Sequence, residues 1–230
     1  MFFRVAATAV AACALALTGS AVAQAAPASG VQLTGKQLAA ELLPLSHFGA
    51  GYELQSGSTF NSGSKLEHPL VKVDQYTLSC KAWFTKAPQA GYGETGYASN
   101  AFNKFVGGSG ENEGYQQSVY QFPSAAAAAS YYRASYALTA RCEKVTVTID
   151  GKTASLTTQY LKTGHAGGHS AFFDLADTVF EGAPVTVNDT ETVLAGQDVI
   201  TIDAFAYRAP RPLTPNATTL ALIARVDAAG

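Results

Sequence analysis

The segment of residues 115–142, YQQSVYQFPSAAAAASYYRASYALTARC, decides the fold. Its first eight residues predict a strand with Tyr120 and Phe122 on one face. The proline after Phe122 stops this strand, and Ser124 is suited to cap a helix because its hydroxyl can accept a hydrogen bond from the first turn. The alanines that follow have high helix propensity, so we expect a helix over residues 125–141. The sequence therefore predicts a strand that runs directly into a helix.

One face of the predicted helix ends in a cysteine. The residues at helical spacing on that face are Ala127, Tyr131, Ala134, Leu138 and Cys142. Cys142 is thereby placed at the core-facing end of the helix, where a disulfide to a neighbouring strand is geometrically natural.

The residues after this helix predict antiparallel strands. Residues 144–149 alternate apolar and polar side chains, and Asp150-Gly151 is a strong signal for a type I′ hairpin turn. The elements expected next are a return strand at 152–161, a glycine-rich loop at 163–168, a strand or helical turn at 171–179, and strands at 184–188, 191–194 and 198–207, the last two joined by a turn at 195–197.

Helices are predicted near both ends of the chain. Thr34 and Gln37 have the spacing of a capping box, and Pro44 marks the end of the helix that follows. Thr214 caps the final helix, with Pro215 in its first turn. The elements expected between the first helix and residue 115 are a short strand at 52–54, a strand at 71–83 that carries Cys80, and a short helix at 97–105. Hairpin-connected strands with helices at the sides or ends are typical of an α+β fold.

The first 25 residues predict a secretory signal peptide. One arginine precedes an apolar run from Val5 to Leu17, which is too short to span a bilayer, and small residues follow it. Cleavage is expected after Ala25, with a second legal site after Ala23. The alternative is a lipoprotein with Cys13 as its lipid-anchored end, although the apolar run continues past Cys13. No later stretch is apolar enough to cross a membrane.

The mature chain is expected to hold a short disordered lead-in, residues 26–32, and one domain, residues 33–230. Loss of the leader removes Cys13 and leaves Cys80 and Cys142, an even pair that predicts one disulfide in an oxidising compartment. Such a bridge stabilises a fold by roughly 4 kcal/mol in the chain-entropy treatment. The alternative is two unpaired buried thiols; metal ligation is disfavoured because no Cys-x-x-Cys spacing occurs.

Composition and motifs exclude several function classes. The formal net charge is −2 and no basic stripe occurs, so nucleic acid is not an expected partner. Neither a Walker loop nor a dinucleotide fingerprint is present, so no cofactor is expected. A serine nucleophile elbow is also missing, because Gly107-Gly108-Ser109-Gly110 has the wrong spacing.

Two groups of side chains are candidates for a site. His165 and His169, four residues apart, could share a metal with Asp174, but the two glycines between the histidines argue against the helix that this geometry needs, so an exposed loop is favoured. Tyrosines could line a carbohydrate or lipid cleft, with ordinary strand and edge positions as the alternative. The tyrosines considered as ligand contacts are Tyr92, Tyr97, Tyr115 and Tyr120.

Several segments together resemble the PknH-like extracellular domain family, the sensor domains of certain actinobacterial receptor kinases and related secreted proteins or lipoproteins. They are the strand-Phe-Pro-Ser-helix segment from Ser118 that ends at Cys142, the Leu42-Leu43-Pro44 end of the first helix before Gly51-Tyr52, and the closing amphipathic helix. Kinase-type members commonly carry two disulfides and a Trp shortly before the helix-end cysteine, whereas this chain has Thr139-Ala140-Arg141 there.

The resemblance implies a twisted antiparallel sheet flanked by helices around a cleft that binds an extracytoplasmic ligand. It favours a secreted, non-catalytic sensor whose partner is a small molecule or a component of the cell envelope. Two other functions stay open at this point. One is an envelope hydrolase with a site assembled from loops, and the other is a structural or protein-interaction module.

Overall fold

The computed structural model describes residues 31–61, 73–76, 97–107, 113–149, 152–207 and 216–229. In these ranges the chain forms one antiparallel sheet of nine strands in the order β1-β3-β4-β9-β8-β7-β6-β5-β2. Within the same described ranges, three α-helices and one 3-10 helix accompany the sheet. The α+β class and the single domain expected from the sequence are confirmed.

The elements have the following bounds. The helices are α1 Gly35–Glu41, η1 Leu45–His47, α3 Ala125–Arg141 and α4 Asn216–Ala229. The strands are β1 Tyr52–Asn61, β2 Val73–Tyr76, β3 Ser99–Gly107, β4 Glu113–Gln121, β5 Lys144–Ile149, β6 Lys152–Ala166, β7 His169–Phe180, β8 Thr186–Ala195 and β9 Asp198–Tyr207.

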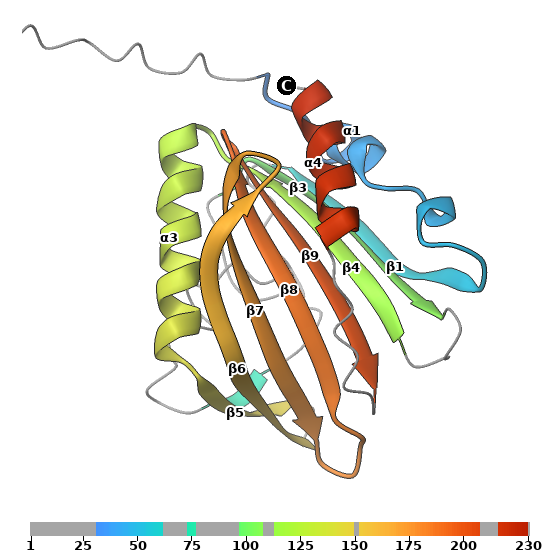
Figure 1. The fold of residues 1–230 in the computed structure, drawn as a ribbon, viewed down its shortest axis with the longest axis vertical. Helices are drawn as coiled ribbons and strands as arrows, with labels where there is room; N and C mark the ends of the chain where they lie inside the picture. Colours follow the sequence, from blue (N-terminus) through green and yellow to red (C-terminus); the bar gives the residue numbers. More distant parts are fainter. Residues whose placement is uncertain are drawn as a thin grey trace, which may run out of the picture.

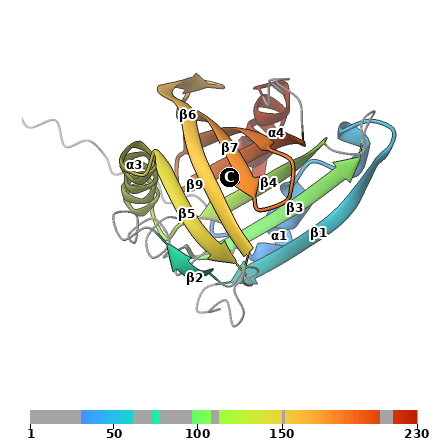
Figure 2. The same cartoon turned by 90° about the horizontal axis from the view of Figure 1, so that it is seen from below.

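Helices cover both faces of the sheet (Figure 1). Side chains alternate between the faces along each strand, and directly paired residues of neighbouring strands share a face. We call the face that packs against α1 and α4 the α4 face, and the other the α3 face. Seen from below, α3 and α4 lie on opposite sides of the strands (Figure 2).

Each face has its own apolar core. On the α4 face, side chains of α1, α4 and the central strands pack together; they include Leu38, Leu42, Val119, Val193, Ile200, Ile202, Leu222 and Ile223. The core of the α3 face is smaller and holds Tyr120, Phe122, Ala128, Tyr131 and Val199. Arg225 of α4 donates hydrogen bonds to the carbonyl oxygens of Ala40 and Glu41. These bonds satisfy the free carbonyls at the end of α1 and fix the two helices to each other.

Residues 115–142 form the predicted strand followed by the predicted helix. The helix runs over Ala125–Arg141, and the Ser124 hydroxyl accepts a hydrogen bond from the Ala127 amide. Tyr120 and Phe122 lie in the same core cluster. On the helix face, Ser135 is buried where the spacing had pointed to Ala134. The capping box at the start of α1 is also confirmed.

Two predictions were wrong because sheet pairing outweighs local sequence. Residues 97–105 do not form a helix: β3 occupies 99–107 and pairs with β1 on one side and β4 on the other. Phe102 and Phe105 therefore pack on opposite faces of the sheet. The expected glycine-rich loop at 163–168 is also wrong. There β6 continues to Ala166 and turns at Gly167 and Gly168, whose φ angles of 56° and 87° favour glycine.

Other strands are longer than the sequence indicated. The expected strand at 52–54 extends to Asn61, and the ambiguous stretch at 171–179 is strand β7. The two strands expected at 184–188 and 191–194 form one continuous strand, β8. The leader, Asp150-Gly151, Thr214 and Pro215 lie outside the described residues, although the pairing of Ile149 with Lys152 agrees with the predicted hairpin.

Candidate functional site

The predicted tyrosine contacts lie on both faces of the sheet. Tyr97 and Tyr120 pack on the α3 face, with ring centroids 5.7 Å apart. Tyr115 lies on the α4 face, where its ring is 5.1 Å from that of Phe48. Tyr92 is outside the described residues. The three described tyrosines therefore occupy two aromatic clusters on opposite faces and line no common site.

The predicted histidine–aspartate group does not come together either. His169 is on the α4 face, where its Nε2 lies 3.0 Å from Asp227 Oδ2 of α4. His165 and Asp174 are on the α3 face, and the four-residue step along β7 from Ser170, the partner of His165, to Asp174 spans about 13 Å. Among the described residues no three His, Cys, Asp or Glu side chains are grouped to hold a metal ion.

The predicted disulfide is not tested. Cys142 is buried at the C-terminal end of α3, where the helix spacing placed it. Cys80 lies outside the described residues. The bridge between them stays a prediction.

A mixed polar and aromatic cluster lies on the α4 face below α4, on three neighbouring strands. Lys162 of β6 is paired with Phe173 of β7, and Phe173 with Glu191 of β8. In the adjoining row Tyr160 and Asp189 flank Leu175. Because paired residues share a face and neighbouring strands lie about 4.8 Å apart, these side chains form one surface. We call the five residues Tyr160, Lys162, Phe173, Asp189 and Glu191 the β6–β8 patch.

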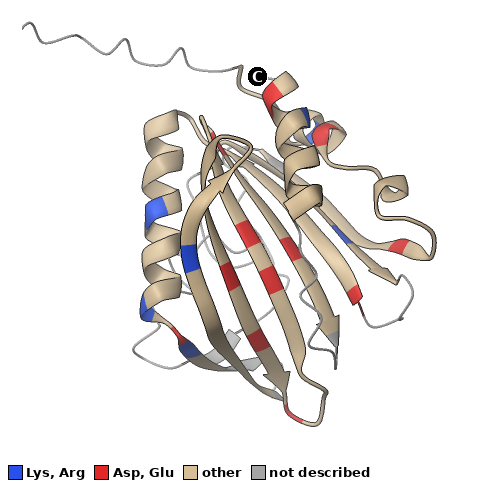
Figure 3. Cartoon of the chain, viewed as in Figure 1, with Lys and Arg blue, Asp and Glu red and all other residues tan. Residues whose placement is uncertain are grey.

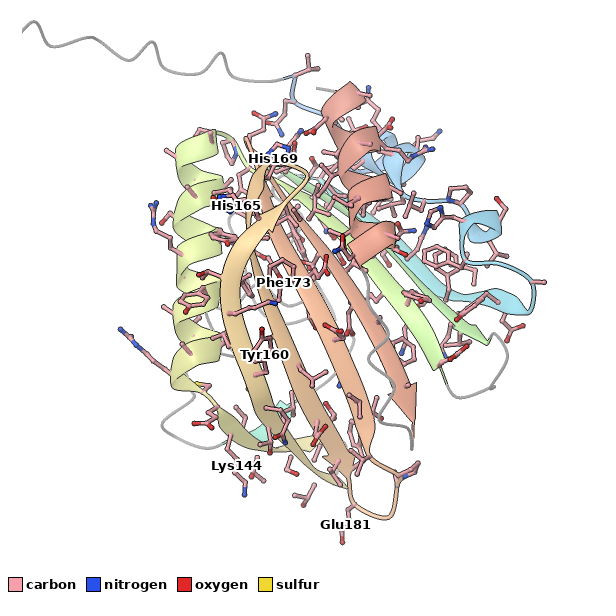
Figure 4. The ribbon with its side chains drawn as sticks, viewed as in Figure 1. Lys144, Tyr160, His165, His169, Phe173 and Glu181 are labelled. Atoms are coloured by element: carbon pink, nitrogen blue, oxygen red, sulfur yellow. The ribbon has the colours of Figure 1, made fainter. Side chains whose placement is uncertain are left out.

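Two aromatic side chains of the patch, Tyr160 on β6 and Phe173 on β7, are labelled in Figure 4. Lys162 Nζ lies 5.4 Å from the ring centroid of Tyr160 and 5.3 Å from that of Phe173. Tyr160 is 47% exposed, whereas Phe173 also packs against the core. The hydrogen bond with Tyr160, followed by the nearby charges, raises the pKa of Lys162. A cation this close to both rings is attracted by their π-faces.

The inner edge of the patch is a buried carboxyl group. Glu191 is 4% exposed, and its Oε2 has no hydrogen-bond partner among the described residues. Burial, with a smaller effect from Asp189, raises the pKa of Glu191, while a hydrogen bond with Thr219 of α4 and the charge of Lys162 act against that rise. Burial also raises the pKa of Asp189. Acidic positions gather on β7, β8 and β9, with a basic position on β6 (Figure 3).

The patch offers the groups of a ligand-binding surface. It offers an exposed aromatic surface, one ammonium donor and two carboxylate acceptors, of which one has an unused oxygen. Such a combination orients a ligand through a few polar contacts on an apolar base.

Sequence reasoning missed this patch because no motif marks it. Its residues come from three strands that become neighbours only through sheet pairing. The available signal was the spacing of Asp189 and Glu191, two residues apart in a strand, which directs both acids to one face. One such pair is too common to identify a site by itself.

Comparisons with known proteins agree on the kind of domain. A family model described as PknH-like extracellular domain matches residues 9–197. The crystal structure of the extracellular domain of PknH from Mycobacterium tuberculosis is similar, with a TM-score of 0.62 and 19% sequence identity, and the match covers 86% of this chain and 98% of that one. At this identity the likeness concerns the fold.

A weaker structural match is a putative uncharacterized protein from Mycobacterium smegmatis. It has a TM-score of 0.41 and 11% identity, over 80% of this chain and 92% of that one. A comparison with curated proteins found no match. In the described part of the chain no helix has the length and hydropathy of a membrane span.

Proposed function

This chain belongs to the PknH-like extracellular domain family and so acts outside the cell, and on that premise we propose that it is a secreted, non-catalytic sensor that binds its ligand at the β6–β8 patch. The ligand is a small molecule or a component of the cell envelope. The patch would form one wall of the cleft that the family resemblance implies.

The observation that carries this proposal is the unused oxygen of Glu191. A buried polar atom without a partner costs roughly 1–3 kcal/mol, so folded proteins rarely retain one without a reason. In the cross-strand row Phe173 lies between Glu191 and exposed Lys162, so the unused acceptor is buried one side chain inside the exposed edge of the patch. A ligand that displaces the side chains covering Oε2 and donates a hydrogen bond to it would remove that cost on binding.

A thermal-shift screen of the mature protein tests the proposal. The panel contains envelope glycans, lipids and small metabolites. A ligand at ten times its Kd adds about 1.4 kcal/mol to the stability of the folded state, which raises Tm by about 3 °C in a domain of this size. We expect at least one compound to do so with the unaltered protein.

Patch variants locate the binding event. Tyr160→Ala and Lys162→Ala should abolish the Tm shift, because they remove the ring and the donor at the exposed edge. Leu54→Ala and Lys36→Ala are matched controls, since both side chains are exposed on other elements, and they should retain the shift. A ligand whose Tm shift survives both patch substitutions would show that the site lies elsewhere.

A further inference from the structure

We propose that the ligand of the β6–β8 patch is the uncharged pyranose ring of an oligosaccharide. This inference rests on the proposed function, since it names the ligand class of the same site. Three features of the patch support it: the two aromatic rings, the two carboxylate acceptors and the balance of charge.

The two aromatic rings lie within reach of one small group. A single ammonium group, that of Lys162, lies within 5.4 Å of both the Tyr160 and the Phe173 centroids. One small group can therefore contact both rings at once. One face of a pyranose ring carries C–H groups and is apolar, so it can take the place of the lysine over Tyr160 and bury apolar area there. The flexible Lys162 side chain is exposed and can move aside to donate to a ring oxygen.

The inner edge of the patch requires hydrogen-bond donors. When ionised, Glu191 and Asp189 only accept hydrogen bonds, and Glu191 Oε2 has an unused position. The hydroxyl groups at the rim of a sugar ring are donors of suitable size. Stacking on Tyr160 and Phe173 brings that rim toward β8, since Glu191 is the direct cross-strand partner of Phe173.

Charge excludes the other ligand classes. An anionic ligand would meet two carboxylates, Asp189 and Glu191, against one lysine. A cationic ligand would compete with the Lys162 ammonium group for the same rings and acids, and the two positive charges would repel each other. A lipid tail would desolvate Lys162 and Asp189 without giving either a hydrogen bond, which is costly for charged groups. An uncharged ring with hydroxyl donors satisfies all five patch residues.

Isothermal titration of the mature protein with defined probes tests the inference. Cellotetraose and tetra-N-acetylchitotetraose represent uncharged pyranose chains, tetragalacturonate represents an anionic chain, and phosphatidylglycerol vesicles represent a lipid surface. We expect an uncharged tetrasaccharide to bind with a Kd below about 1 mM, the affinity range of a small exposed site, and at least tenfold more tightly than tetragalacturonate.

Variants tie that binding to the patch. Tyr160→Ala and Glu191→Gln should each weaken tetrasaccharide binding at least tenfold, whereas Tyr160→Phe, which keeps the ring, and Leu54→Ala should change Kd less than threefold. If neither uncharged tetrasaccharide binds, the inference is overturned. If tetragalacturonate or the vesicles bind instead, and Tyr160→Ala abolishes this, the ligand class is wrong but the site stands. If the tetrasaccharides bind equally well to Tyr160→Ala, both the inference and the proposed site fall.

Discussion

Gln117 and Glu191 are side chains of nearly the same size that lie in one row of the sheet and have opposite surroundings. Both are on the α4 face, separated by Ile202 of β9, and both are buried, at 0% and 4% exposure. Gln117 accepts a hydrogen bond from the Leu43 amide at 2.9 Å and donates to the Leu43 carbonyl at 2.8 Å. Glu191 keeps one oxygen unused.

The difference separates a part of the sheet face whose buried polar groups are paired from the part that we propose binds the ligand. Gln117 substitutes for missing backbone partners and fixes the segment after α1 to the sheet. Glu191, two strands away, lies where the apolar core gives way to exposed Tyr160 and Lys162. We therefore expect changes at Gln117 to act on stability, and changes at Glu191 to act on binding.

Removing the Gln117 amide should have the largest effect on stability. Gln117→Leu keeps the volume but leaves the buried amide and carbonyl of Leu43 without partners, which should cost about 3 kcal/mol in the free energy of unfolding. Urea unfolding followed by circular dichroism measures this. Gln159→Ala, a change at an exposed glutamine, should cost less than about 0.5 kcal/mol. Equal losses for the two variants would contradict a structural role for Gln117.

Buried carboxyl groups on the opposite face make stability depend on pH. Burial, with added repulsion from Asp203 and Asp189, raises the pKa of Asp174 to about 7. This pKa is higher in the folded than in the unfolded chain. The contribution of Asp174 to stability is therefore fully present below about pH 4 and is lost as pH rises through 7. Asp174→Asn should raise the free energy of unfolding by about 1–2 kcal/mol at pH 8 and leave it nearly unchanged at pH 4.

Unfolding of both proteins in urea at pH 4, 6 and 8 checks this expectation. The control is Glu53→Gln, because Glu53 is an exposed carboxylate on an edge strand. It should change stability by less than about 0.5 kcal/mol at each pH. A variant Asp174→Asn that is less stable than the unaltered protein at pH 8 would mean that the carboxylate has a partner that compensates for its burial.

Glu191→Gln should alter stability less than either change above. The amide relieves the burial of a charge but loses the attraction to Lys162, so the net effect should lie within about 1 kcal/mol. Binding of an uncharged tetrasaccharide should nevertheless weaken at least tenfold. A stability loss as large as that of Gln117→Leu would place Glu191 with the structural residues.

His169→Ala should have the smallest effect. Its pair with Asp227 is a surface contact, with the side chains 27% and 48% exposed. Pairs of this kind contribute about 0.5 kcal/mol or less. Thermal unfolding should show a Tm within about 2 °C of the unaltered protein, with tetrasaccharide affinity unchanged. A larger loss would show that the hairpin tip of β6 and β7 depends on this pair.

The fold was more predictable from the sequence than the site. Ser124 with its alanine run and the Thr34–Gln37 capping box encode α3 and α1 locally, so both helices were predicted correctly. β3 was not, because its asparagines, phenylalanines and single glycine form a strand only between β1 and β4. The β6–β8 patch depends entirely on such pairing: the proximity of Lys162 and Glu191 requires the register of three strands.

Mapping of a titration by nuclear magnetic resonance tests the central claim, that the β6–β8 patch is the binding surface, most directly. Amide spectra of ¹⁵N-labelled mature protein would be recorded with increasing tetra-N-acetylchitotetraose, in parallel with the Glu191→Gln variant. We predict shift changes concentrated on residues 160–162, 172–175 and 188–192 and largely absent from the variant. Changes centred on α3 or on the Tyr115 cluster, or changes equal in the variant, would contradict the account.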